Sequence, residues 1–126
     1  MLIGIFISSV GSASSFEGQI QQVVAAESDG FDSFWIAQIS GVDTLTLLAL
    51  AGQRTKRIEM GTAVVPTYSR HPLVLAQQAL TTQAATGGRL TLGIGLSHRS
   101  LVEDRLGLSY DRPTLHTREY MSVLRP

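Results

Sequence analysis

Four short apolar runs recur along the chain, and their spacing limits the fold more than any other feature. None of them alternates cleanly between apolar and polar residues. Near-continuous apolar runs of this length are typical of strands buried on both faces of a parallel sheet. The strands predicted from them cover residues 2–8, 31–37, 58–65 and 90–96. Trp35 lies inside the second run and is expected to be a core residue rather than a platform for a ligand.

Residues that favour helix starts and stops lie between these runs. The expected starts are Ser14 with Glu17 at capping-box spacing, Asp43 as an N-cap, and Pro72 and Pro113 in the first turn. Gly30 is expected to end the first helix, and Gly87 or Gly88 the third, because glycine commonly follows a helix C-terminus. Strands and helices therefore alternate four times along the sequence.

Units of one strand and one helix, roughly 30 residues long, build either a doubly wound sheet or a (β/α)8 barrel. A complete barrel of this type takes about 250 residues, whereas this chain has 126. The predicted fold class is therefore α/β, with the first four β-α units of a TIM-type barrel forming one domain over residues 1–126. The missing units are expected to be C-terminal, because the first strand follows Met1 directly.

The charge balance excludes several classes of partner. Ten basic and ten acidic residues cancel, and no basic stripe is present, so nucleic acid is not an expected partner. Nor is a membrane, because no stretch approaches the roughly 20 apolar residues of a membrane span. The N-terminal residues lack the basic region of a signal peptide, which predicts a cytoplasmic protein. The absence of cysteine excludes disulfides and thiolate zinc sites.

Polar segments follow each predicted strand. They cover residues 8–15, 38–43, 66–72 and 97–104, and are rich in hydroxyl, amide, glycine or imidazole groups. In either candidate fold, ligands bind at the carboxyl ends of the strands. These segments therefore predict a polar mouth for a small-molecule substrate, although loop structure and helix capping explain several of their residues equally well. Capping is the simplest interpretation of His71, which precedes Pro72.

Single residues narrow this prediction only slightly. Gly93 and Gly95 lie within one strand, where glycine indicates a bulge, a barrel bend or the close approach of a ligand. His98 follows that strand, where an imidazole has little structural reason to be. There is no nucleophile elbow and no dinucleotide fingerprint, and the three histidines are too scattered to predict a metal site.

Four motifs together resemble the bacterial luciferase-like family of flavin and deazaflavin oxidoreductases. They are "GTAVV" at 61–65, "RHPLVLA" at 70–76, "GRLTLGIG" at 88–95 and "REY" at 118–120. The segment "GFDSFWIAQ" at 30–38 also matches the second strand of that family. The resemblance covers essentially the whole chain and is greatest to the branch that uses coenzyme F420.

The resemblance implies a (β/α)8 barrel with a flat redox ring at its carboxyl end. It also implies a non-proline cis peptide at Ala63–Val64, forming a bulge that supports one face of the ring. The implied cofactor-binding residues are Thr62, Ala63, Val64, Gly95 and Ser97. His98 and Gln38 are the implied catalytic candidates, the first as an acid/base or orienting group. Gln38 and Ile39 stand where F420 enzymes often have an Asp-His pair, which favours a different substrate.

Three functions remain open at this point. The first is F420-dependent hydride transfer between a deazaflavin and an organic substrate. The second is an FMN-dependent monooxygenase of the same family. The third is a non-catalytic half-barrel that self-associates, because an open sheet leaves two edges and an apolar face uncovered. A homo-oligomer, or pairing with a missing C-terminal half, is therefore expected.

Overall fold

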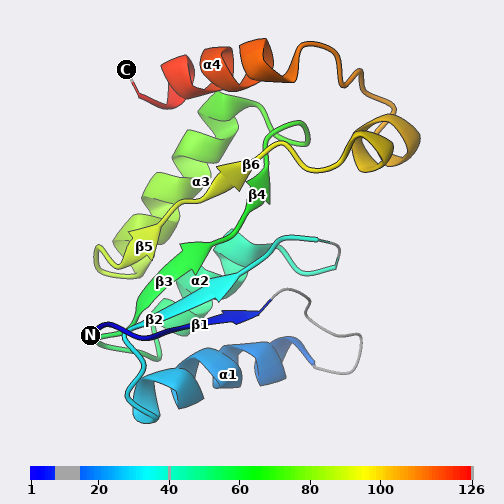
Figure 1. Cartoon of the computed structure of the whole chain (residues 1–126). Coiled ribbons are helices and arrows are strands. Elements are labelled where there is room, and N and C mark those ends of the chain that lie inside the picture. Colours follow the sequence, from blue (N-terminus) through cyan, green and yellow to red (C-terminus); the bar gives the residue numbers. More distant parts are fainter. Residues whose placement is uncertain (8–14, 40, 126) are drawn as a thin grey trace.

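A computed structural model describes residues 1–7, 15–39 and 41–125. It contains the predicted four strand-helix repeats, in an α/β fold (Figure 1). The strands are β1 (Gly4–Ile7), β2 (Ser33–Ile36), β3 (Glu59–Thr62), β4 (Val65–Pro66), β5 (Leu90–Thr91) and β6 (Ile94–Gly95). The helices are α1 (Phe16–Ser28), α2 (Thr44–Gly52), α3 (Pro72–Ala85) and α4 (Pro113–Leu124), with a short π-helix, η1, at Leu101–Arg105.

The sheet is parallel throughout and follows the chain order. One sheet has the order β1-β2-β3-β5, and β4 pairs with β6 in a second, two-stranded ladder. Parallel neighbours joined through helices on one side are the start of a barrel that has not closed. The predicted partial barrel is therefore confirmed.

Two predicted strands are each divided in the structure. The run 58–65 forms β3 and continues as β4, and the run 90–96 forms β5 and then β6. The interruption of the first run falls at Ala63 and Val64. Their backbone groups hydrogen-bond to the end of β2 instead of to the run 90–96. The prediction of one continuous strand was wrong at this point, whereas the bulge implied by the family resemblance is present.

The helix starts agree with the sequence in three cases. Asp43 accepts a hydrogen bond from the Thr46 backbone N–H at 2.9 Å, and α3 and α4 begin at their predicted prolines. His71 Nδ1 accepts from the Leu73 N–H at 3.3 Å, as expected for a cap. The first helix differs, because its N-cap is Ser15, which accepts from the Gly18 N–H. Ser14 lies outside the described residues.

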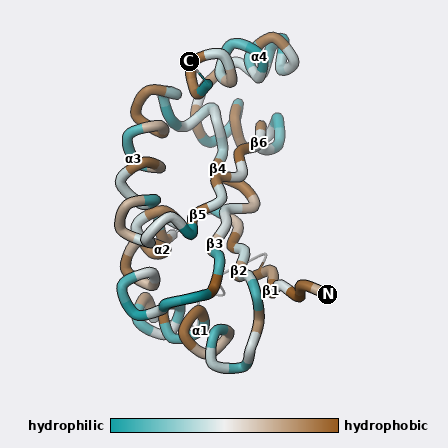
Figure 2. The backbone as a smooth tube through the Cα atoms, turned by 90° about the vertical axis from the view of Figure 1, so that its left-hand side faces the viewer, coloured by the Kyte–Doolittle hydropathy of each residue, from teal (hydrophilic) through white to brown (hydrophobic). Residues whose placement is uncertain are grey.

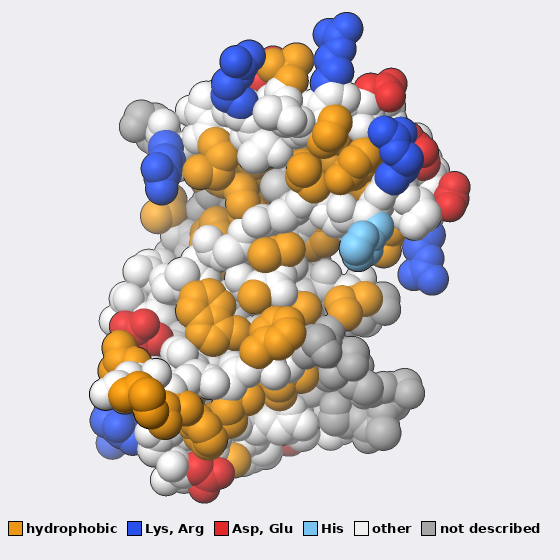
Figure 3. All heavy atoms as spheres, viewed as in Figure 1, with side chains coloured by type: hydrophobic (Ala, Val, Ile, Leu, Met, Phe, Trp, Pro, Cys, Tyr) orange, Lys and Arg blue, Asp and Glu red, His pale blue; other side chains and the backbone are white. Residues whose placement is uncertain are grey.

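The helices cover one face of the sheet and leave the other open. The row Ile5, Phe34 and Met60 faces the helices, and Phe34 and Met60 are fully buried there. Figure 2 shows α1, α2 and α3 on the same side of the strands. The alternate row carries Phe6, which is 56% exposed, and Trp35. Hydrophobic side chains gather on this uncovered face in Figure 3.

Trp35 is a correction to the sequence analysis. It is half-buried on the uncovered face and is not part of the core between sheet and helices. Its indole N–H donates to Ser33 Oγ at 3.0 Å. Its ring fills the space beside Gly61, where a Cβ would lie 2.2 Å from a ring carbon. None of the described helices is long and apolar enough to cross a membrane.

Arg89 joins four backbone segments at the amino end of the sheet. Its Nε donates to Thr86 O at 2.7 Å, and its two Nη groups donate to Gly52 O, Thr55 O and Oγ1, and Ile58 O at 2.8–3.1 Å. The carbonyls of Gly52 and Thr86 belong to the C-terminal ends of α2 and α3, where carbonyls lack partners within the helix. One guanidinium therefore satisfies two helix ends and fixes both to the start of β3.

Replacing Arg89 should destabilise the fold more than replacing an exposed arginine. We expect Arg89→Met to lower the free energy of unfolding by about 3 kcal/mol, because several part-buried carbonyls lose a charged donor. Urea unfolding measures this change. Arg54→Met is the matched control, because Arg54 pairs with Glu17 on the surface and such pairs contribute little. Equal effects of the two variants would contradict the role given to Arg89.

Candidate active site

A pocket of about 240 Å³ lies at the carboxyl ends of the strands. Three segments line it. They are residues 37–39 after β2, Ala63, Val64 and Pro66 at the passage from β3 to β4, and Ser97, His98 and Leu101 after β6. Five residues predicted for the site, Gln38, Ala63, Val64, Ser97 and His98, therefore line one pocket. The predicted loop 8–14 and Ser40 lie outside the described residues.

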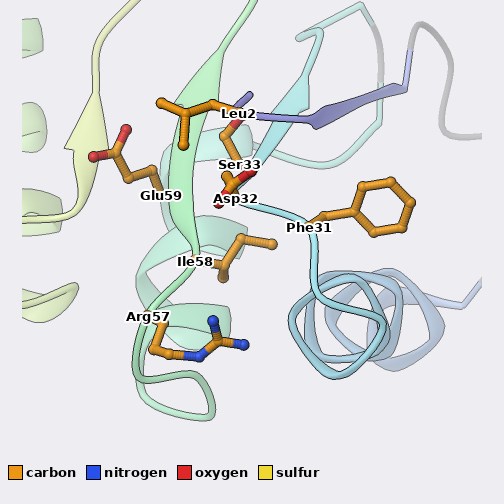
Figure 4. A pocket seen from close by; sticks show the side chains of 7 residues that line it. All are labelled: Leu2, Phe31, Asp32, Ser33, Arg57, Ile58 and Glu59. Atoms are coloured by element: carbon orange, nitrogen blue, oxygen red, sulfur yellow. The ribbon is translucent and has the colours of Figure 1, made fainter.

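A second pocket, of about 320 Å³, lies at the opposite end of the sheet (Figure 4). Two of its polar side chains already serve the fold: Asp32 Oδ2 accepts from the Ile3 N–H at 2.7 Å, and Arg57 donates to Glu27 O at 3.1 Å. In a barrel of this type, ligands bind at the carboxyl ends of the strands and not at the amino ends. The smaller pocket is therefore the candidate active site.

The Ala63–Val64 segment forms one wall of this pocket. The peptide bond between them is cis, as the family resemblance implied. The Ala63 N–H donates to Ile36 O at 2.9 Å, and Val64 O accepts from the Gln38 N–H at 3.3 Å. These two bonds attach the segment to the end of β2, and Val64 remains 37% exposed. The wall is therefore apolar and held by backbone hydrogen bonds.

Thr62 lies behind this wall. It is fully buried, and its hydroxyl donates to Gly93 O at 2.8 Å and accepts from the Gly93 N–H at 2.9 Å. A Cβ on Gly93 would lie 1.9 Å from Thr62 O. The described geometry thus gives Thr62 a bond between strands, and it does not line the pocket. Contact of Thr62 with a cofactor stays a prediction.

Gly95 acts on the pocket through Val64. A Cβ at Gly95 would lie 2.5 Å from Val64 Cγ2, so the absence of a side chain lets Val64 pack against β6. Gly95 itself is not among the residues that line the pocket. The sequence left a bulge, a barrel bend and the close approach of a ligand open for Gly93 and Gly95. The geometry gives a different reason that was not considered there, the close approach of the neighbouring strand segment at Thr62 and Val64.

The two catalytic candidates differ in whether their side chains are held by hydrogen bonds. Gln38 Oε1 accepts from Thr44 Oγ1 at 2.8 Å, which directs this amide oxygen to the start of α2. His98 is exposed at the rim of the pocket, and no group in the described part of the chain hydrogen-bonds to its imidazole. Its backbone is held, because the Val102 N–H donates to His98 O at 3.0 Å. Catalysis by either residue stays a prediction.

Sequence reasoning missed the aromatic side chains beside the rim. Tyr110 donates its hydroxyl to Ser97 O at 3.3 Å, and its ring stacks on Tyr68 with a centroid distance of 5.3 Å. Tyr68 stacks in turn on His116 at 4.0 Å. The contacts join residues 13 to 48 positions apart, so no local pattern could have predicted them. The only signal was the presence of Tyr68 in the polar segment after strand three.

An unclosed α/β barrel with a pocket at the carboxyl ends of its strands defines the structural class. Residues 1–126, the whole chain, match the sequence model of the luciferase-like monooxygenase family. The chain therefore belongs to the luciferase-like family.

Two curated relatives and one solved structure illustrate the similarity. A Mycobacterium tuberculosis protein that carries the name of a coenzyme F420-dependent oxidoreductase is 38% identical over 109 residues, 86% of this chain and 31% of that protein. The 5,10-methylenetetrahydromethanopterin reductase of Methanolobus tindarius is 30% identical over 101 residues, 79% of this chain and 31% of that protein. The chain thus spans about a third of the length of the curated relatives that it matches.

The solved structure is the oxygenating constituent of 3,6-diketocamphane monooxygenase from Pseudomonas putida, in complex with FMN. It superposes with a TM-score of 0.86 at 22% identity, over 98% of this chain and 39% of that protein. At this identity the likeness supports the fold alone. The M. tuberculosis relative thus carries an F420-dependent oxidoreductase name, and the structural neighbour was solved with FMN bound.

Alanine substitutions should distinguish the two close approaches around the wall. Gly93→Ala is expected to lower the free energy of unfolding by about 3 kcal/mol, because the new Cβ meets a backbone oxygen that cannot rotate away. Gly95→Ala should cost only about 1 kcal/mol, because it meets a side-chain methyl that can change rotamer. Urea unfolding of both variants measures the difference, and an equal loss would refute this account of the strand contact.

Proposed function

We propose that the chain is the amino-terminal half of an F420-dependent oxidoreductase, in which hydride passes between a deazaflavin and an organic substrate. The observation that carries this proposal is the pocket itself, which combines the apolar wall at Ala63 and Val64 with Gln38 and His98 at its rim. The relative that carries an F420-dependent oxidoreductase name supports the choice of cofactor. The cytoplasm is the proposed compartment.

The residues present fit a flat ring. Ala63 and Val64 offer an apolar surface fixed by backbone bonds, and Gly95 lets Val64 lie close to the sheet. Ser97 has a positive φ of 67°, and the following residue, His98, lies at the pocket edge. When bound, the deazaflavin supplies the hydride chemistry. Thr62 contributes through the position of the wall.

The roles of the polar residues follow from their bonds. Gln38 is oriented by Thr44, and its amide nitrogen has no acceptor in the described part of the chain, so it can donate to an oxygen of the substrate. His98 is free to hold or accept a proton at an imidazole nitrogen. Because His98 is exposed in this half-barrel, other residues must exclude water from the pocket before such a transfer is efficient.

An FMN-dependent monooxygenase is the second candidate function. The solved neighbour with FMN supports it, because both cofactors present a flat ring of similar size to such a wall. The identity of that structure to this chain is too low to transfer its activity. F420 is preferred because the more similar curated relative carries the F420 name at 38% identity.

Reconstitution separates the two cofactors. The chain is mixed with oxidised F420 or with FMN, and binding is followed by the change in the visible spectrum of each ring. We expect F420 to bind more tightly, and Val64→Asp to abolish binding because it places a charge against the ring. Val123→Asp is the matched control, because Val123 is similarly exposed but lies in α4 and is not among the residues that line this pocket. Tight FMN binding without F420 binding would reverse the order of the two proposals, and binding of neither would contradict both.

The uncovered sheet face supports a further part of the proposal, namely that the chain pairs with a second half-barrel. Phe6 is 56% exposed and Trp35 is half-buried on this face, and the β1 edge is unpaired among the described residues. Exposed apolar faces and parallel edges favour association. A non-catalytic, self-associating half-barrel is the third function on this basis, with a second copy as its partner.

Sedimentation tests this pairing. The chain is expected to sediment as a dimer or larger species, and Phe6→Asp should shift it towards monomer because a charge is placed on the uncovered face. Phe16→Asp is the control, since Phe16 is also part-exposed but is the first residue of α1 and does not belong to the sheet. A folded monomer of the unmodified chain, without affinity for either ring, would count against both the pairing and the enzyme.

A further inference from the structure

The connection from residue 96 to residue 112 carries two predicted site residues but has no strand ladder to hold it. Ser97 and His98 lie at its start, and the π-helix η1 (Leu101–Arg105) follows. Val102 is fully buried and anchors the middle of the connection. The position of His98 must therefore depend on whatever fastens the two ends of this connection.

Tyr110 fastens the far end of the connection to its beginning. Its hydroxyl donates to Ser97 O at 3.3 Å, and its backbone N–H donates to Glu103 Oε1 at 3.4 Å. The same carboxylate oxygen accepts from Arg99 Nη1 at 2.6 Å, and the Arg99 guanidinium carbon lies 5.1 Å from the centre of the Tyr110 ring. The connection is thus closed upon itself at the residue that precedes His98.

An aromatic column continues from Tyr110 into the body of the fold. We define it as Tyr110, Tyr68, His116 and Tyr120. The Tyr110 and Tyr68 rings are 5.3 Å apart at an interplanar angle of 27°, Tyr68 and His116 are 4.0 Å apart at 4°, and His116 and Tyr120 are 5.6 Å apart at 42°. The column joins the connection after β6, the loop before α3, and α4.

The lower part of the column is fixed to the strands that carry the pocket. His116 Nε2 lies 2.9 Å from Thr67 Oγ1, and the buried Thr67 donates its N–H to Gly95 O at 2.9 Å. The Tyr120 hydroxyl donates to Arg70 O at 2.9 Å. Tyr110 is consequently held relative to β4 and β6, not only relative to its own connection.

We propose that the aromatic column is a positioning device for His98, and that the Tyr110 hydroxyl is its point of action. By holding the Ser97 carbonyl, Tyr110 fixes a residue whose φ of 67° is uncommon outside glycine. The orientation of Ser97 sets the direction in which the next residue, His98, leaves the strand. The effect of this positioning on ring or substrate binding rests on the proposed function, whereas the positioning itself does not.

The chain offers two matched controls, because three tyrosines of the column differ in what their hydroxyls do. Tyr110→Phe removes the bond to Ser97 O, and Tyr120→Phe removes an equivalent bond to Arg70 O, away from the pocket. Tyr68→Phe removes a buried hydroxyl that has no hydrogen-bond partner in the described part of the chain. All three variants keep their rings and therefore the column.

The test compares these variants by NMR and by ligand titration. Two reporters need no cofactor: the exchange rate of the Val102 amide, which donates to His98 O, and the chemical shift of the His98 imidazole. Tyr110→Phe is expected to speed that exchange about two- to tenfold, the range of one net hydrogen bond, and to shift the His98 resonance. It should weaken binding of oxidised F420 by a similar factor.

The controls decide the interpretation. Tyr120→Phe is expected to lower the midpoint of unfolding without moving the His98 resonance, and Tyr68→Phe to leave both reporters unchanged. Unchanged reporters in Tyr110→Phe, or the same changes in Tyr120→Phe, would overturn the inference. Changed reporters with unchanged F420 affinity would support the positioning of His98 and contradict a contact of Ser97 or His98 with the ring, so the two failures are distinguishable.

Discussion

The contact between Thr62 and Gly93 is the constraint on which the candidate site depends. The Thr62 hydroxyl both donates to and accepts from the backbone of Gly93, and Thr62 O occupies the space that a side chain at position 93 would need. These contacts hold the end of β3 against the segment between β5 and β6. Beyond it the third strand leaves its ladder at Ala63 and Val64 and resumes at Val65, whose N–H donates to Gly93 O. The apolar wall of the pocket is the segment released between these two attachments.

The sequence was sufficient for the repeating architecture and for most helix starts, because those depend on local chemistry. Apolar runs set the strands, and Asp43, Pro72 and Pro113 act within their own first turns. The interruption of the strand at residues 63 and 64 could not be predicted from local chemistry. Composition predicts an uninterrupted strand there, and only the resemblance to a family implied the cis peptide that the structure contains. Ser15 replaced the expected Ser14 because either serine suits the cap and only the backbone path decides between them.

The features that could not be predicted join residues far apart in the sequence. Arg89 belongs to a recognisable motif, yet its acceptors at Gly52, Thr55 and Ile58 are separated from it by more than 30 residues. Trp35 was placed in the core because large apolar side chains are normally buried, and a half-barrel has a second face where this expectation fails. In both cases the outcome depends on which elements become neighbours, and a single sequence contains no direct record of that.

The open face also explains why the pocket is only partly enclosed. Its described walls come from the segment after β2, the segment from Ala63 to β4, and the connection after β6. A ring resting on Val64 would have one face covered and the other turned towards the axis of the unclosed barrel. Under the proposed function, the groups that hold the rest of such a cofactor, and those that exclude water from His98, would lie on units that complete the cylinder. The geometric requirement on these units is the same for a continuing polypeptide and for a second copy of the chain. They must pair in parallel with the open edges and bring an apolar surface against Phe6 and Trp35.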